Sequence, residues 1–298
     1  LYDKRNQVSF VSQGIISYLA GQKSVLFQSS YSSVEELKEA GLNMQMETVI
    51  EEIDTNHKKV FYSRNNSKKT KVTDYDKLIL ATGSYPAMTS VPFDKKSNLY
   101  FLKSMEDAIK AEEFLATAKN IAVIGGGMTG VEVARITQDR GIQTPLIPRN
   151  KNLLNDYLDE PASRLLERWM NAEGTRLLLN TEVTEISVDG ENTVVQTANG
   201  QKIAVDGVIF TIGFRPNSYL LNQQVELGDR GAVVVDEYMQ TSCPDVFAVG
   251  DVSTTYVNLL EENRYLPHAS DAVRDGEIAA INLLEARQKI TSTQGTYH

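Results

Sequence analysis

The chain is poor in the residues that build metal and disulfide sites. Its 298 residues include a single cysteine, Cys243, and three histidines, His57, His268 and His298. One cysteine excludes an intramolecular disulfide, a CxxC redox pair and a cysteine-based zinc site. Three scattered histidines argue against a histidine-rich metal centre. We therefore expect Cys243 to be a small buried apolar side chain.

Long apolar runs and an excess of positive charge are also missing. No run of about 18 or more apolar residues occurs, so the sequence predicts no membrane-spanning helix. Lysine and arginine total 30 against 39 aspartate and glutamate residues, a net charge of −9, which argues against nucleic-acid binding. No secretory signal is recognisable, which fits a cytoplasmic protein. The length favours about two domains.

Short apolar runs that end at glycine alternate with helical patterns along the chain. Strands are expected at residues 78–81, 121–124, 142–147, 208–212 and 246–249, and helices at 33–40, 104–118, 130–140, 160–172 and 270–285. Continuous apolar strands are typical of parallel sheets with both faces covered, and their alternation with helices predicts an α/β fold. Residues 64–73 are expected to form a hairpin tip and residues 193–198 an antiparallel addition.

The strongest local motif is IAVIGGGMTGVEVA at residues 121–134. It follows a predicted strand and opens a predicted helix, the context in which GxGxxG indicates dinucleotide binding. Gly125 permits the tight turn, Gly127 lets the backbone approach a pyrophosphate, and Gly130 lets helix and strand pack closely. The helix N-terminus offers N–H groups to the phosphates. A glycine-rich turn without a ligand is the alternative.

The end of the next strand bears on the choice of nucleotide. An acid there would bind the ribose hydroxyls of NAD, but the strand ends in Pro148 and Arg149, with Lys151 nearby. A cation in place of an acid favours the 2′-phosphate of NADP. The alternative is that Arg149 is only a solvated loop residue.

Three further motifs extend the pattern over nearly the whole chain. They are YDKLILATG at residues 75–83, GFRPN at 213–217 and TSCPDVFAVGD at 241–251. With GGGMTG, they resemble the FAD-dependent pyridine nucleotide–disulfide oxidoreductases, in the branch of NADH oxidase, NADH peroxidase and coenzyme A-disulfide reductase. The resemblance implies two Rossmann-like domains, with an NAD(P)-binding domain at residues 104–236 inserted into an FAD-binding domain at 1–103 and 237–298.

The resemblance also implies the nucleotide contacts. FAD would be held by Asp3, Lys4, Ala81, Thr82, Gly83, Gly250, Asp251, His268, Ala269 and Ser270. NAD(P) would be held by Gly125, Gly127, Met128, Thr129, Gly130, Glu132, Arg149 and Gly213. A carboxylate at Asp3 can accept two ribose hydroxyl hydrogen bonds, and Asp251 would take a ribityl hydroxyl. His268 could be a catalytic base or simply a packing or solvent-facing histidine.

The chain departs from the family at its redox centre. SFVSQG at residues 9–14 stands where the family has S-F-x-S-C-G, so Gln13 occupies the position of the redox cysteine. An amide cannot cycle through sulfenate or disulfide, and Cys243 is not expected to replace the thiol. Met128 stands where the family usually has an aromatic residue that gates the nicotinamide pocket.

The ends of the chain also differ from the family pattern. The sequence starts after the strand and GxGxxG turn that hold the FAD diphosphate, and it stops before the interface domain that makes the homodimer. We therefore expect a fragment, and we expect this chain made from Leu1 to His298 to retain a pyridine nucleotide but little FAD.

The resulting functional hypothesis is an FAD-dependent NAD(P)H oxidase. Hydride would pass from NADH or NADPH to FAD, and then to a small acceptor: oxygen, peroxide, a quinone or a disulfide. Without a redox cysteine, oxygen reduction to hydrogen peroxide is the expected outcome. The alternative is a catalytically inactive nucleotide-binding relic or a redox-responsive binding protein of the same fold. A simple NAD(P) dehydrogenase is disfavoured by the ATG and AVGD motifs.

Overall fold

The computed structural model describes residues 1–6, 8, 13–22, 24, 32–65, 67, 69–87, 91–257, 261–285 and 287–290. The chain divides into two compact units. The first comprises Leu1–Ser9, Ser30–Tyr85 and Phe214–His298, and the second comprises Phe10–Ser29 and Pro86–Gly213. Both units mix helices and strands, so the predicted α/β class is confirmed. No helix among these described residues is long and apolar enough to cross a membrane.

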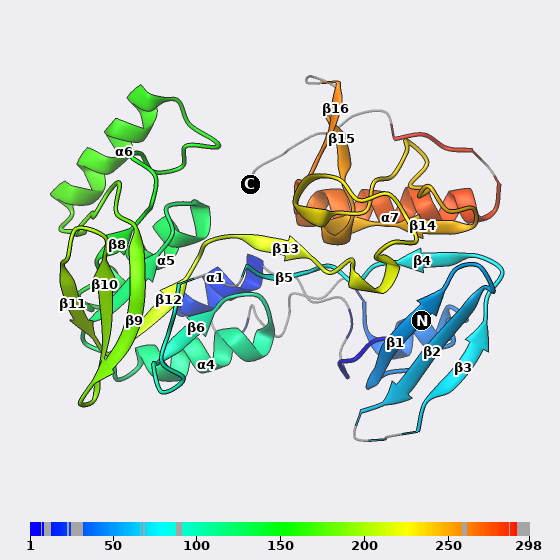
Figure 1. Ribbon diagram of the computed structural model, residues 1–298, viewed down its shortest axis with the longest axis horizontal. Helices are drawn as coiled ribbons and strands as arrows, with labels where there is room; N and C mark the ends of the chain where they lie inside the picture. Colours follow the sequence, from blue (N-terminus) through cyan, green and yellow to red (C-terminus); the bar gives the residue numbers. More distant parts are fainter. Residues whose placement is uncertain are drawn as a thin grey trace. The chain divides into compact units, whose positions relative to one another are not determined.

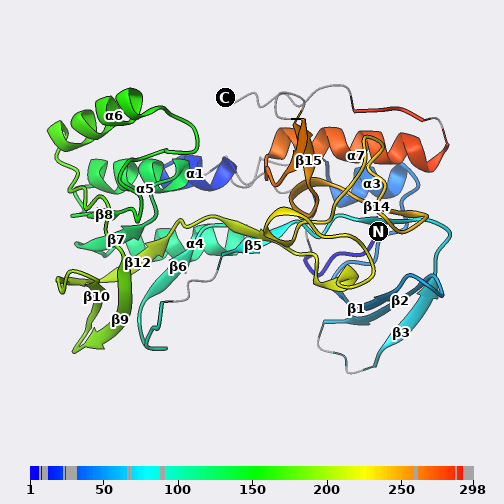
Figure 2. The same cartoon turned by 45° about the horizontal axis from the view of Figure 1, so that its top comes forward.

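The second unit is built on a four-stranded parallel sheet in the order β6-β12-β7-β8 (Figures 1 and 2). Its strands are β6 (Leu99–Phe101), β12 (Gly207–Phe210), β7 (Ile121–Ile124) and β8 (Leu146–Ile147). All four residues of β7 are buried, as a strand covered on both faces requires. The strand expected at 142–147 is only two residues long, because Pro145 has no N–H to donate to a ladder.

Three predicted helices accompany this sheet. They are α4 (Met105–Leu115), α5 (Met128–Asp139) and α6 (Glu160–Ala172). Ser104 and Asp107 form a capping box at the start of α4, and Asp159 caps α6. The antiparallel addition is also confirmed: β10 (Asn192–Thr197) lies between β9 (Val183–Asp189) and β11 (Lys202–Val205).

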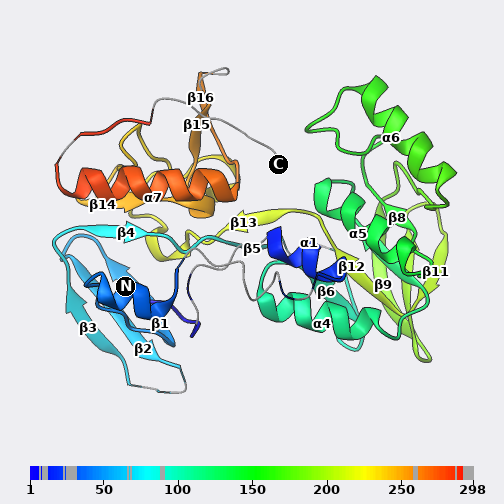
Figure 3. The ribbon, with the colours of Figure 1, turned by 180° about the vertical axis from the view of Figure 1, so that it is seen from behind.

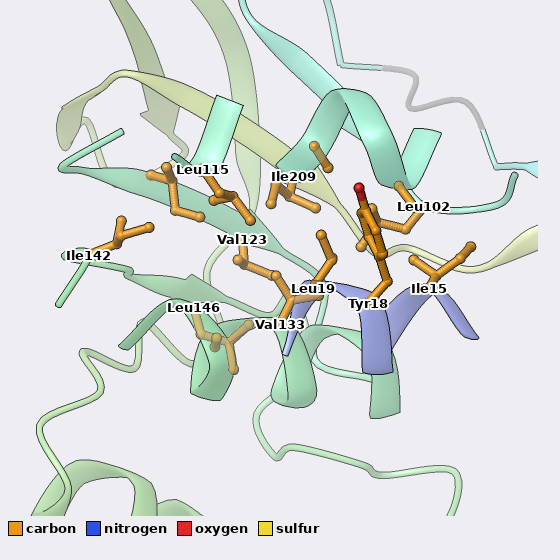
Figure 4. Packing of buried hydrophobic residues seen from close by; sticks show 14 of the residues in the cluster. Ile15, Tyr18, Leu19, Leu102, Leu115, Val123, Val133, Ile142, Leu146 and Ile209 are labelled. Atoms are coloured by element: carbon orange, nitrogen blue, oxygen red, sulfur yellow. The ribbon is translucent and has the colours of Figure 1, made fainter. Parts of the chain in front are cut away.

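A short helix from the N-terminal region completes the core of the second unit. Helix α1 (Gln13–Leu19) packs against α4 and α5 (Figure 3). Its buried Ile15, Tyr18 and Leu19 join Leu102, Val133 and other residues in one apolar cluster (Figure 4). This burial places residues near position 13 in the second unit, rather than with the other N-terminal residues.

The first unit combines an antiparallel sheet with short parallel pairing. Strands β1 (Thr48–Asp54), β2 (Lys59–Arg64) and β3 (Lys71–Asp74) form the sheet, and the β2–β3 connection is the expected hairpin. Strand β4 (Leu78–Leu80) pairs in parallel with β14 (Val246–Ala248), and β5 (Ser84–Pro86) pairs with β13 (Phe214–Pro216). Strands β15 (Thr255–Val257) and β16 (Glu262–Arg264) form a small hairpin.

Two helices of the first unit match the sequence expectation (Figure 2). Helix α3 (Val34–Glu39) begins at a capping box formed by Ser33 and Glu36, where the sequence predicts a helix. Helix α7 spans Ala269–Leu283. Short 3₁₀ turns lie at Tyr219–Leu221, Asp229–Gly231 and Gly250–Val252.

The boundaries of the two units differ from those expected at 103/104 and 236/237. Strand β6 precedes residue 104 but pairs with β12, which assigns it to the second unit. Leu221 and Val233 follow Gly213 but are fully buried in the apolar core of the first unit. Strand pairing and side-chain burial therefore decide these boundaries. The assignment of FAD and NAD(P) to the two units stays a prediction.

Candidate nucleotide-binding sites

At Gly125 and Gly130 of the glycine-rich turn, a side chain would collide with a backbone carbonyl oxygen. Gly125 has a φ of +122°, and a Cβ there would lie 2.4 Å from the carbonyl oxygen of Thr211. A Cβ on Gly130 would lie 2.2 Å from the carbonyl oxygen of Gly125. The first and third glycines thus permit the tight strand-to-helix turn that the motif predicts.

The middle glycine faces open space. Gly127 is the N-cap of α5, has an ordinary φ of −79°, and makes no side-chain cap. Among the described residues beyond its chain neighbours and its own helix, no heavy atom lies within 4 Å of a Cβ built on it. The first N–H groups of α5, from Met128, Thr129 and Gly130, have no intrahelical partner by helix geometry. The turn therefore leaves room and donors for the diphosphate of a dinucleotide.

Arg149 lies beside a hollow of about 280 Å³ in the same unit. The Thr181 N–H donates to the carbonyl of Pro148 at 3.1 Å, which holds residue 181 next to Arg149. The hollow is lined by Arg149, Asn180, Thr181, Glu182, Ala198 and Asn199. Its amide and hydroxyl groups suit a sugar or phosphate. One cation and one carboxylate lie together there, so the electrostatic preference for an anion is moderated.

Three other residues predicted to bind NAD(P) differ in their exposure and in their contacts. Met128 is exposed at the start of α5. Glu132 lies one turn further along α5; neighbouring protein atoms desolvate its carboxyl and raise its pKa, although the residue as a whole is exposed. Gly213 has a φ of +91° and accepts a hydrogen bond from the Ala87 N–H at 2.9 Å.

In the first unit, two loops meet at the carboxyl ends of paired strands. Because β4 and β14 are parallel, Ala81, Thr82 and Gly83 lie at the same sheet edge as Gly250 and Asp251. This edge is where open α/β sheets bind ligands. The two loops are joined directly, since the Ser84 hydroxyl donates to the Asp251 carboxylate at 2.7 Å.

Neighbouring segments fix both loops. The Thr82 hydroxyl donates to the carbonyl of Asn217 at 2.7 Å, and the Asn217 N–H donates to the carbonyl of Gly83 at 2.9 Å. Gly83 and Gly250 have φ values of +66° and +68°, the left-handed conformation that favours glycine. The family motifs ATG and GFRPN thus form one hydrogen-bonded corner.

Helix α7 begins at Ala269, 18 residues after Asp251 in the sequence. His268 is the N-cap and makes no side-chain cap, so the N–H groups of Ala269 and Ser270 have no capping partner on it. These groups could face negative charge on a reduced flavin.

Two buried residues near Asp251 escaped the sequence analysis. Tyr265 is 5% exposed, and burial together with the charge of Asp251 raises its pKa. Asp275 is 1% exposed and accepts a hydrogen bond from the Gly250 N–H. Only the tertiary structure brings both residues to this corner.

Asp3 has a partner within its own segment. Its carboxylate accepts hydrogen bonds from the backbone N–H of Arg5 at 2.8 Å and from the guanidinium of Arg5 at 2.9 Å and 3.1 Å. A ribose bound at Asp3 would therefore share or displace Arg5. The carbonyl of Lys4 accepts from the Asn65 amide at 2.8 Å.

The two residues tied to thiol chemistry are Gln13 and Cys243. Gln13 begins α1, and its side chain lies outside the described part of the structure. Cys243 is half-buried beside the apolar core of the first unit, rather than fully buried as expected. Among the described residues no group of three or more His, Cys, Asp and Glu side chains could hold a metal ion.

Comparison with known proteins defines the class. The family model of pyridine nucleotide-disulphide oxidoreductases matches residues 4–276. An NADH oxidase of Enterococcus faecalis is 34% identical over 99% of this chain and 67% of its own length, and one of Lactococcus lactis is 33% identical with the same shares. The chain belongs to the pyridine nucleotide-disulphide oxidoreductase family, in its NADH oxidase branch.

Solved structures agree on the fold. The engineered water-forming NADPH oxidase bound to NADPH matches with a TM-score of 0.95 at 31% identity, over 98% of this chain and 65% of that one. The water-forming NADH oxidase of Lactobacillus brevis matches with a TM-score of 0.92 at 31% identity, over 97% and 64%. The chain thus spans about two thirds of the length of these relatives.

Proposed function

We propose that the full-length protein is a flavin-dependent NAD(P)H oxidase that reduces oxygen to hydrogen peroxide. The observation that carries this is the open phosphate cradle at Gly127, in a chain whose family uses FAD and a pyridine nucleotide. The corner formed by Gly83, Gly250 and Asp251 supports a second nucleotide site. The residues present thus fit the diphosphate of a pyridine nucleotide at Gly127 and the ribityl chain of FAD at Asp251.

Each site has a distinct task in this proposal. The N–H groups of Met128, Thr129 and Gly130 bind the diphosphate of the pyridine nucleotide. Asp251, oriented by Ser84, accepts a ribityl hydroxyl, and the N-terminus of α7 stabilises negative charge near the flavin. The flavin, when bound, accepts hydride from the nicotinamide and passes electrons to oxygen, which is chemistry that the protein side chains cannot supply.

Gln13 supports peroxide as the product. One NAD(P)H, one proton and one oxygen molecule give one NAD(P)⁺ and one hydrogen peroxide, with no protein thiol involved. Reduction of a disulfide or of peroxide by the family's thiol route requires a cysteine at this position, and an amide cannot form the covalent intermediates. A catalytically inactive nucleotide-binding protein is the second candidate, favoured by the same substitution.

The test measures flavin and product together. Full-length protein should show flavin absorption that bleaches with NADPH without air, and in air should form about one hydrogen peroxide per NADPH consumed. Gln13→Cys should lower that ratio and restore some thiol-dependent reduction, whereas the matched Gln13→Ser should not. Bound flavin that never bleaches would favour the inactive protein. Water formation or coenzyme A-disulfide reduction by the unaltered protein would contradict the proposed product.

Arg149 leads us to propose NADPH as the preferred donor. It lines a hollow with Asn180, Thr181 and Asn199, next to the end of β8 where an NAD-binding acid is missing. The engineered NADPH oxidase supports this, since its five substitutions remove one aspartate and introduce two arginines. A charge-assisted phosphate contact would favour NADPH about tenfold once solvent exposure and Glu182 are considered.

Arg149→Ala tests the nucleotide choice. We expect the ratio of NADPH to NADH affinity to fall about tenfold. Lys202→Ala, which removes an exposed cation elsewhere in the same unit, should leave the ratio unchanged. If NADH binds more than about tenfold tighter than NADPH, or if Arg149→Ala leaves the ratio untouched, the preference is wrong.

We further propose, from the family resemblance, that the full-length protein is a cytoplasmic homodimer. Light scattering on the full-length protein tests the dimer, and fractionation of source cells tests the location.

A further inference from the structure

Asp275 is a buried carboxylate beneath the turn that carries Asp251. It lies on α7 and is 1% exposed. One carboxylate oxygen, Oδ2, accepts a hydrogen bond from the Gly250 N–H at 3.4 Å. The other, Oδ1, is buried and has no hydrogen-bond partner among the residues that the structure describes.

The turn rests closely on this part of α7. Gly250 begins the 3₁₀ turn Gly250–Val252, and a Cβ built on it would lie 3.0 Å from the Cβ of Ala272. Helix α7 therefore approaches the turn at Gly250, and the only described side-chain contact of the Gly250 N–H is Asp275. Asp251 is the next residue of this turn, and its carboxylate accepts the Ser84 hydroxyl.

Such a carboxylate is costly to keep in a core. Transfer of an ionised group from water is unfavourable unless it is fully paired, and half of this one is not. Burial raises the pKa of Asp275 to about 6, which shows that the environment resists its charge. An apolar residue or an amide would be easier to accommodate, so a functional demand explains the acid better than packing does.

We propose that Asp275 is a positioning residue for FAD: its carboxylate holds the Gly250 N–H and thereby fixes Asp251 for the ribityl chain. This inference rests on the proposed function, in which Asp251 contacts FAD. Because an ionised acceptor is stronger than a neutral one, FAD affinity should weaken when Asp275 is protonated.

Several charged groups share this environment. Arg274 precedes Asp275 on α7 and pairs with Asp271 at 2.8 Å; the arginine favours ionisation of Asp275 and the aspartate opposes it. Asp251 lies on the facing turn, and His268 caps the same helix. The variants must therefore separate the effect of Asp275 from that of His268.

The experiment measures FAD dissociation constants of the full-length protein between roughly pH 5 and roughly pH 7.5. In the unaltered protein, affinity should fall about tenfold as the pH drops through about 6. Asp275→Asn keeps an oxygen acceptor that does not titrate. The FAD affinity of this variant should lie between those of the unaltered protein and Asp275→Ala, and it should not fall as the pH drops through about 6. Asp275→Ala should bind FAD weakest, about tenfold below the unaltered protein at the higher pH.

Two further variants separate the possible failures. Glu277→Gln removes an exposed charge two residues along α7 and should keep both affinity and pH profile. Asp251→Asn tests the ribityl contact itself. If Asp251→Asn weakens FAD binding but the Asp275 variants leave affinity and pH profile unchanged, the positioning role is overturned while the proposed function stands. If the unaltered protein binds no FAD, the proposed function fails. If Asp275→Ala does not fold, the pH dependence of FAD binding by Asp275→Asn still tests whether Asp275 is a positioning residue.

Discussion

At the residue scale, Asp275 links a cost in stability to a role in binding. The pKa of this carboxyl is about 6 in the folded chain against 3.8 ordinarily, so the folded state binds its proton more tightly than the unfolded state. The stability that the proton confers is present below about pH 4 and is lost as pH rises toward about 6. The ionised side chain thus lowers the free energy of unfolding at neutral pH by about 3 kcal/mol.

Asp275→Asn should therefore stabilise the protein in a pH-dependent way. Without FAD, the variant should gain up to about 3 kcal/mol in free energy of unfolding near pH 7.5 and little near pH 4. Urea unfolding at the two pH values measures this, with Glu277→Gln as the exposed control. An equal gain at both pH values would show that charge burial is not the cause.

At the element scale, two glycines of the β7–α5 turn have different roles: one is needed for folding and the other for nucleotide binding. Gly125 and Gly127 both belong to the GxGxxG motif, but the structure gives them different constraints. At Gly125 a side chain would meet the Thr211 carbonyl at 2.4 Å in a left-handed backbone conformation. At Gly127 a side chain would project into open space with an ordinary φ.

The two alanine variants should consequently fail differently. Gly125→Ala should destabilise the second unit by more than about 1 kcal/mol, because steric overlap adds to an unfavourable φ. Gly127→Ala should keep the thermal stability of the unaltered protein but lose affinity for NADPH, because the methyl group fills space intended for the pyrophosphate. Calorimetry and nucleotide titration of both variants measure this. Unchanged NADPH binding by Gly127→Ala would contradict the assignment of the cradle.

At the scale of the whole molecule, two compact units have apolar cores of their own. Leu221, Val233 and Phe247 belong to the core of the first unit, and Val123 and Ile209 to that of the second. Separate cores can unfold as separate cooperative units. If each unit binds its own nucleotide, each nucleotide should stabilise a different transition.

Differential scanning calorimetry of the full-length protein tests this expectation. FAD should raise one transition and NADPH the other, each by about 2.7 kcal/mol at a hundredfold excess over the dissociation constant. Gly127→Ala should remove the shift caused by NADPH and retain that caused by FAD. A single transition that both nucleotides raise equally would exclude independent sites in separately unfolding units.

The sequence by itself determined the α/β class, the helices α3 to α7, the apolar strands β4, β7, β12 and β14, and the family. These features depend on local signals: apolar runs ending at glycine, the capping box at Ser33, and motifs whose glycines serve local backbone geometry. Such signals act over a few residues and can be recognised without knowing the fold.

Only the tertiary structure decided where the units divide, how short β8 is, and which residues support Asp251. The packing of Leu19 against Val133, the pairing of β6 with β12, and the contact of Asp275 with Gly250 join segments far apart in sequence. No local pattern encodes them, because burial and hydrogen bonding between distant segments arise only once the chain has folded. Asp275 followed an ordinary helical pattern in the sequence, and its burial beneath the FAD-motif turn became visible only in three dimensions.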